Sequence, residues 1–164
     1  MASWYLGKIK YQKEEESGRL KTIAETYLVD ALTYTEAEAR LYEQIVTGAA
    51  DFAVQRISRM RLADLFTYED GESWFKAKVV YVSVDERSGK EKKVINYMLI
   101  NALDIHQALA RLTESLRTML IPYEITDLVL TPILDVFPYE RSEEGVVPEG
   151  FRPLSEVVAE RSPL

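Results

Sequence analysis

The chain of 164 residues carries a formal net charge of −7 at pH 7 and contains no cysteine. Disulfide bonds, thiolate zinc sites and cysteine nucleophiles are therefore excluded. No apolar run reaches the roughly 18 residues that a spanning helix needs, and the N-terminus lacks the apolar core of a signal peptide, so we expect a cytoplasmic protein with no membrane partner. The acidic balance argues against nucleic-acid binding by overall charge, although a local basic face is compatible with it.

The first predicted element is a strand over residues 3–11, because side chains alternate there between two faces. Tyr5, Gly7 and Ile9 share one face, and Trp4 lies on the other. A Ser-Gly turn and a β-rich run at 22–31 follow, and this order of strand, turn and strand predicts a hairpin.

A helix is predicted next. Thr33 and Glu36 fit a capping box, in which a short side-chain oxygen caps the first turn and the residue three positions later reaches back. Apolar residues at helical spacing support the helix, which we expect to end near Thr47. A third strand is expected at 53–61, and the unit closes with a short tail at 62–69.

All of these elements return about 70 residues later. Residues 28–43, LVDALTYTEAEARLYE, recur as LINALDIHQALARLTE at 99–114. We interpret this as a tandem duplication of a β-β-α-β unit, with repeats 1–70 and 71–140 forming a single domain over 1–140. One unit alone buries too little core, so we predict an α+β fold in which the two units pack with pseudo-twofold symmetry, with two helices against antiparallel sheet.

The C-terminal segment, 141–164, lies outside the repeat and is acidic, with prolines and glycines that interrupt regular structure. Two interpretations stay open for it. It is either a solvated tail or a segment whose apolar residues dock on the body or on a second copy.

The sequence resembles an uncharacterised family, a domain of unknown function (DUF4494), of Bacteroides-type bacteria and their phages. The resemblance rests on four motifs: WY at 4–5, YLVDAL with TEAEAR within 27–40, DERSGKEKK at 85–93 and TPILDVFPY at 131–139. It implies a cytoplasmic protein often encoded by phages or mobile elements. It implies no active site.

Residues with catalytic or metal-binding potential are few. His106 is the only histidine, and its counterpart in the first repeat is Thr35, so we interpret it as a surface residue at a helix start. Asp64 and Asp135 are repeat-related carboxylates that could share a magnesium ion near a pseudo-twofold axis. A single carboxylate pair is an unspecific pattern, so we assign no metal, no cofactor and no catalytic residue.

The first repeat has a basic cluster that the second lacks. The cluster consists of Arg56, Arg59 and Arg61, and the counterparts are Asp127, Leu130 and Pro132. If the third strand lies beside the first, Lys8, Lys10 and Trp4 extend this face. Such a face could hold single-stranded nucleic acid or a nucleotide by stacking and phosphate contacts. It could equally form ion pairs within the chain or with a partner.

We therefore interpret the chain as a non-enzymatic binding or adaptor protein of phage or mobile-element type. It would act by association with a protein partner or with itself, because the edge strands of a doubled antiparallel unit favour homo-oligomers through sheet extension. The alternative is a nucleic-acid or nucleotide binder that uses the basic strand face. A metal-dependent enzyme at Asp64 and Asp135 is the third hypothesis.

Overall fold

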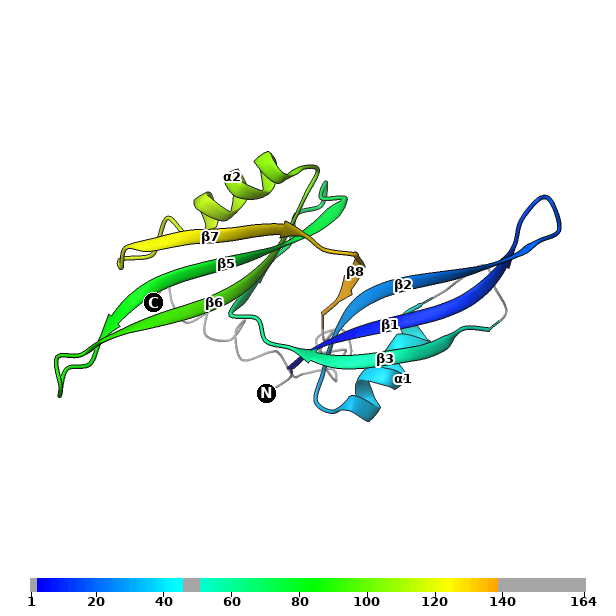
Figure 1. Cartoon of the computed structure of the whole chain (residues 1–164), viewed down its shortest axis with the longest axis horizontal. Helices are drawn as coiled ribbons and strands as arrows, with labels where there is room; N and C mark the ends of the chain where they lie inside the picture. The colour runs from blue at the N-terminus through cyan, green and yellow to red at the C-terminus, as the bar shows by residue number, and fades with distance from the viewer. Residues whose placement is uncertain (1–2, 46–50, 139–164) are drawn as a thin grey trace, which may run out of the picture.

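The structure is a computed structural model that describes residues 3–45 and 51–138. Within these residues the chain forms the order β-β-α-β-β twice (Figure 1). The bounds are β1 Ser3–Glu14, β2 Leu20–Ala31, α1 Tyr34–Gln44, β3 Ala53–Met60, β4 Asp64–Phe66, β5 Ser73–Val84, β6 Glu91–Ala102, α2 Ile105–Ser115, β7 Tyr123–Leu130 and β8 Ile133–Phe137. Neither of these two helices is long and apolar enough to cross a membrane.

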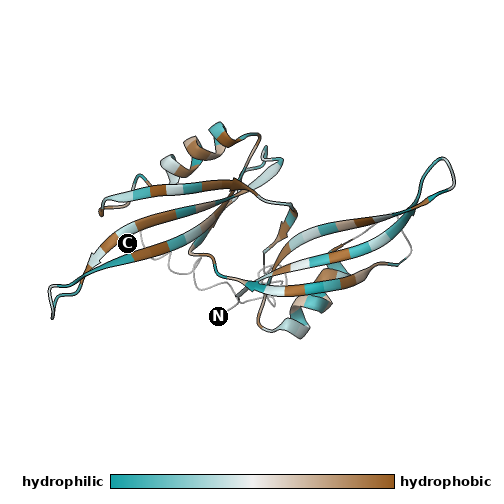
Figure 2. Ribbon diagram, in the orientation of Figure 1, coloured by the Kyte–Doolittle hydropathy of each residue, from teal (hydrophilic) through white to brown (hydrophobic). Residues whose placement is uncertain are grey.

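Two long hairpins, β1–β2 and β5–β6, form the centre of each repeat, as predicted. Their turns contain Gly18 and Gly89, which have φ values of 82° and 69°. Glycine adopts this left-handed conformation without the steric cost that a side chain would add. The two hairpins extend in opposite directions (Figure 1), and their tips are hydrophilic (Figure 2).

Each sheet contains three strands from one repeat and one from the other. The strand orders are β3-β1-β2-β8 and β4-β6-β5-β7. The first three strands of each repeat pair antiparallel, whereas β8 joins β2 in parallel and β4 joins β6 in parallel. The repeats therefore exchange their last strands reciprocally, as expected for two units related by a pseudo-twofold axis.

This exchange extends the predicted fold. The α+β class and the two β-β-α-β units are confirmed, and antiparallel pairing holds within each unit. The segments 62–69 and 133–140 were expected only as closing tails. Instead, β4 and β8 add a parallel fourth strand and make both sheets mixed. Their partners lie in the other repeat, and no local sequence pattern records a pairing of that kind.

Both helices begin at the predicted capping boxes. The backbone N–H of Glu36 donates to Oγ1 of Thr33 (3.1 Å), and that of Gln107 donates to Oδ1 of Asp104 (2.8 Å). An N-terminal cap of this kind stabilises a helix by about 1 kcal/mol. α1 ends about one turn earlier than predicted because the backbone at Ile45 is extended (φ −86°, ψ 118°).

Each helix covers one face of its own sheet and forms a separate core with it. The core under α1 contains the buried residues Tyr5, Ile9, Val29, Ala31, Ala37, Leu41 and Ile45. The core under α2 contains Phe75, Ala77, Val79, Met98, Ile100, Ala102, Ala108, Leu112 and Leu116. The face predicted for Tyr5 and Ile9 is therefore the face that the helix covers.

A third core joins the two repeats. Its buried members are Leu28, Trp74, Leu99, Ile133 and Val136. Leu28 and Leu99 are repeat counterparts on β2 and β6, and both are fully buried. Apolar surface from both repeats is thus removed from water at the centre of the molecule, which favours their association.

Two arginines hold the exchanged segments in place. Arg40 on α1 donates through Nη2 to the carbonyl of Pro138 (2.9 Å), at the end of the strand supplied by the second repeat. Its counterpart Arg111 on α2 donates to Asp70, from the first repeat, and lies 4.2 Å from the centre of the Tyr68 ring. Each helix therefore contacts the chain segment that the other repeat contributes. The acidic segment 141–164 lies outside the described residues.

Candidate functional site

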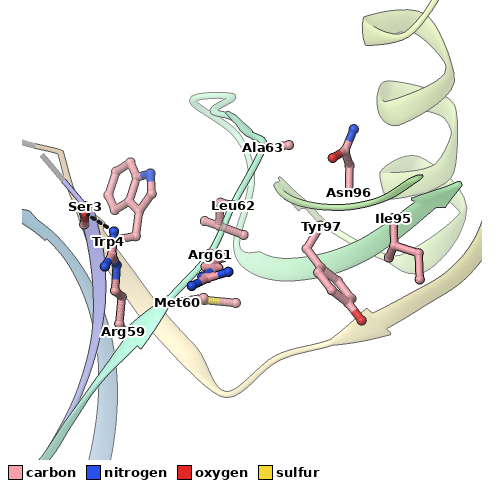
Figure 3. Close-up of a pocket in the computed structure, with 10 residues that line it drawn as sticks. All are labelled: Ser3, Trp4, Arg59, Met60, Arg61, Leu62, Ala63, Ile95, Asn96 and Tyr97. Atoms are coloured by element: carbon pink, nitrogen blue, oxygen red, sulfur yellow. Dashed lines mark hydrogen bonds between the residues drawn. The ribbon is translucent and has the colours of Figure 1, made fainter. Parts of the chain in front are cut away.

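A groove of about 770 Å³ lies between the two repeats (Figure 3). Its walls come from the start of β1, the end of β3, the connector to β4, and β6 of the second repeat. The residues that line it are Ser3, Trp4, Arg59, Met60, Arg61, Leu62, Ala63, Ile95, Asn96 and Tyr97. Two of them are arginines, and among the described residues none that lines the groove is acidic. The groove is therefore a local basic site on an acidic chain.

Both arginines lie at the end of β3, which borders the groove. Arg59 pairs with Tyr5, close to the end of β3 and the start of β1. Its Nη2 donates to Oγ of Ser3 at 3.0 Å, which orients the guanidinium. Arg61 follows β3 directly, and its side chain is exposed. Both guanidinium groups retain N–H donors that can form hydrogen bonds to the oxygens of a bound anion.

Aromatic and apolar side chains form the rest of the walls. In Figure 3, Tyr97 and Ile95 point to one side of β6, whereas Asn96 points to the other. Tyr97 is 37% exposed, and Nζ of Lys76 lies 4.5 Å from the centre of its ring. Trp4 is half-buried, so part of its surface remains open at the groove. The groove thus combines positive charge with flat apolar surfaces.

The equivalent region of the second repeat lacks this combination of positive charge and exposed aromatic surface. The counterparts of Arg59, Arg61 and Tyr97 are Leu130, Pro132 and Thr26. The counterpart of Trp4 is Trp74, which is buried in the core between the repeats. After the duplication, charge and aromatic surface were therefore kept or acquired on one side only.

The structure divides the predicted basic cluster. Arg59, Arg61 and Trp4 line the groove, whereas Arg56 lines a separate hollow of about 310 Å³ beside α1, together with Glu38. Lys8 pairs with Arg56 across β1 and β3, so these two strands are neighbours, a condition that the sequence alone left open. Lys8 and Lys10 do not line the groove.

Sequence reasoning missed the wall that the second repeat supplies. Tyr97 and Ile95 were not singled out, because nothing local shows that β6 lies opposite the end of β3. Met60, at the end of β3, was not singled out either. One signal was present in the sequence, since Tyr97 replaces the threonine found at position 26 in the first repeat.

The two candidate metal ligands lie on different sheets. Asp64 begins β4 and Asp135 lies within β8, and each accepts a hydrogen bond from the backbone N–H of the next residue at 2.8 Å. Asp135 lines a hollow of about 410 Å³ with Glu69 and Glu72. Among the described residues, no three His, Cys, Asp or Glu side chains are grouped closely enough to hold a metal ion. His106 is exposed.

A carboxylate bridges two tyrosines on the first sheet. The hydroxyls of Tyr11 and Tyr27 donate to Oε1 and Oε2 of Glu25 at 2.6 and 2.5 Å. Burial, followed by the hydrogen bond to Glu25, raises the pKa of Tyr27 far above its ordinary value. The hydrogen bond to Glu25 is the main cause of a smaller rise in the pKa of Tyr11. These hydrogen bonds connect the neighbouring strands β1 and β2 through Glu25.

The comparisons with known proteins give a family but no function. A family model described as "Domain of unknown function (DUF4494)" matches residues 3–139, a range that includes nearly all of both repeats and every residue that lines the groove. A search of curated proteins found no match.

Proposed function

The chain belongs to the DUF4494 family, and we propose that it is a non-enzymatic binding protein that holds single-stranded nucleic acid in the groove between its repeats. One observation supports this most directly. Two guanidinium groups and two aromatic rings line one groove, and the described part of its wall has no carboxylate.

The chemistry of the wall fits phosphates and bases together. Arginine presents a planar fork of donors that matches phosphate oxygens, and hydrogen bonds to charged groups contribute about 1.5–3 kcal/mol each. Bases stack on aromatic side chains with about 1–3 kcal/mol per base, largely independent of sequence. Arg59 and Arg61 would contact phosphates, while Tyr97 and the open part of Trp4 would contact bases.

The size of the groove limits how much ligand it holds. Its volume of about 770 Å³ lies within the roughly 300–1,000 Å³ of small-molecule sites. A short run of nucleotides therefore enters it, while the rest of a longer strand lies outside. Two arginine contacts predict a modest salt dependence, with a slope of log affinity against log salt near −1.4, because each phosphate on a single strand contributes about −0.7.

A fluorescence anisotropy titration with a labelled oligothymidylate tests the proposal. We expect binding at low salt that Arg59→Ser with Arg61→Ser weakens about tenfold or more, since at least 1.5 kcal/mol is lost. Arg56→Ser is the control, because it removes a positive charge from the same strand as Arg59 but outside the groove. Absence of binding at low salt would refute the proposal. An equal loss from Arg56→Ser would place binding elsewhere.

A further inference from the structure

The two sheets leave two long edge strands without a neighbour among the described residues. β3 is the outer strand of the first sheet and β7 that of the second, and both have eight residues. The opposite edge of each sheet is occupied by a short exchanged strand, β8 or β4. The backbone N–H and C=O groups along an edge strand can pair with another chain.

The two edges have opposite charge. β3, AVQRISRM, contains Arg56 and Arg59 and no acidic residue. β7, YEITDLVL, contains Glu124 and Asp127 and no basic residue. Arg56 and Asp127 are repeat counterparts, and each lies next to a bulge and opposite a lysine of the neighbouring strand. The sign of the charge is therefore reversed at one equivalent position of the two strands.

Edge charges and bulges commonly protect a sheet from pairing with other chains. Charges of the same sign on both edges would protect against every combination of edges. With opposite signs, β3 repels β3 and β7 repels β7 of a second copy, while β3 attracts β7. This pattern leaves one combination favourable, and it is the combination of unlike edges.

We propose that β3 of one copy pairs antiparallel with β7 of a second copy, so that the chain associates head to tail. Antiparallel pairing of two equivalent strands places both helices on the same face of the joined sheet. It also places the end of β7, where Val129 and Leu130 are 57% and 60% exposed, beside the start of β3. Pairing would remove this apolar surface from water. Because the two edges differ, the contact is heterologous and propagates into longer assemblies unless the rotation closes a ring.

Charge reversal at the two counterpart positions tests this contact. Sedimentation velocity of the full chain over a hundredfold range of concentration should show assemblies larger than a dimer, and salt should weaken them. Asp127→Arg places a positive charge at this equivalent position of both edges, and Arg56→Asp places a negative charge there, so each variant alone should remain monomeric. The double variant, Arg56→Asp with Asp127→Arg, should assemble again. An equimolar mixture of the two single variants should form hetero-assemblies.

Several results would overturn the proposal. They are a monomer at every concentration, self-association that neither single variant reduces, or a double variant that fails to assemble while melting at the wild-type temperature. Arg87→Asp, on the exposed turn between β5 and β6, is the control for a change of net charge alone and should assemble like the wild type. The two substituted positions lie outside the groove, because neither Arg56 nor Asp127 lines it, although Arg59 and Met60 at the end of β3 do.

Discussion

Asn101 holds Tyr68 through two hydrogen bonds. Nδ2 of Asn101 donates to the carbonyl of Tyr68, and Oδ1 accepts from the backbone N–H of the same residue, both at 2.6 Å. Asn101 lies on β6 and is the one buried polar side chain among the described residues. Tyr68 follows β4, the strand that the first repeat contributes to the second sheet. This pair therefore fixes the crossing between the two repeats.

Replacing Asn101 with alanine should destabilise the fold by about 2–3 kcal/mol. The change removes the partner of the Tyr68 N–H and leaves the Tyr68 carbonyl with only the long bond from the N–H of Gly71 (3.3 Å). An unsatisfied buried group costs about 1–3 kcal/mol. Urea unfolding followed by circular dichroism measures the loss. Asn96→Ala, on the same strand and half-buried, is the control and should cost less than about 1 kcal/mol. Equal losses for the two variants would contradict a special role for Asn101.

The second prediction concerns Gly7, where α1 packs closely against the first sheet. A Cβ at this position would lie 2.4 Å from Cδ1 of Leu41, which is fully buried. Gly7→Ala should therefore cost about 1–3 kcal/mol by overpacking, measured as a lower midpoint of thermal or urea unfolding. The counterpart Ala77 is also fully buried, so the second repeat already accommodates a Cβ there.

A double-mutant cycle identifies the cause of this loss. If the new methyl group clashes with Leu41, the combined cost of Gly7→Ala and Leu41→Ala should be smaller than the sum of the single costs. Strictly additive costs would show that the clash is not the reason.

Whether a structural feature can be predicted from the sequence depends on how far apart along the chain its contacting residues lie. The hairpin turns at Gly18 and Gly89 and the helix starts at Thr33 and Asp104 are local, because residues three to five positions apart determine them. The comparison of two repeats in one chain then gave the order of elements. The exchange of β4 and β8 depends on residues about 35 and about 107 positions apart, which no local pattern encodes.

The groove was only half predictable for the same reason. Arg59 and Arg61 stood out because their counterparts, Leu130 and Pro132, are not basic. Their partner Tyr97 belongs to the other repeat, and only the packing of the two units places it opposite them. Arg56 has the same sequence signal but lies outside the groove. A residue that differs from its counterpart in the other repeat is therefore a candidate for function. The difference alone does not show on which surface of the folded protein that residue lies.

The aromatic wall of the groove gives a third prediction. If Tyr97 stacks on a base, Tyr97→Ala should weaken oligonucleotide binding about 5- to 150-fold, since stacking contributes about 1–3 kcal/mol per base. Tyr97→Phe keeps the ring and should bind nearly as well as the wild type. Anisotropy titrations measure both affinities. A loss in Tyr97→Phe as large as that in Tyr97→Ala would instead indicate that the hydroxyl is the group that matters.

The cluster of Tyr11, Glu25 and Tyr27 predicts how stability changes at alkaline pH. The pKa of Tyr27 is raised in the folded state, mainly by burial and then by the hydrogen bond to Glu25. Above about pH 10 the unfolded chain releases this proton while the folded chain keeps it, so folding becomes less favourable as the pH rises toward the folded pKa. Below pH 10 the contribution is fully present.

Absorbance at 295 nm should show tyrosines that ionise only as the protein unfolds, and Tyr27→Phe should remove part of that late step. Tyr42→Phe, at an exposed tyrosine on α1, is the control and should leave the late step unchanged. If Tyr27→Phe also leaves it unchanged, Tyr27 does not retain its proton in the folded state.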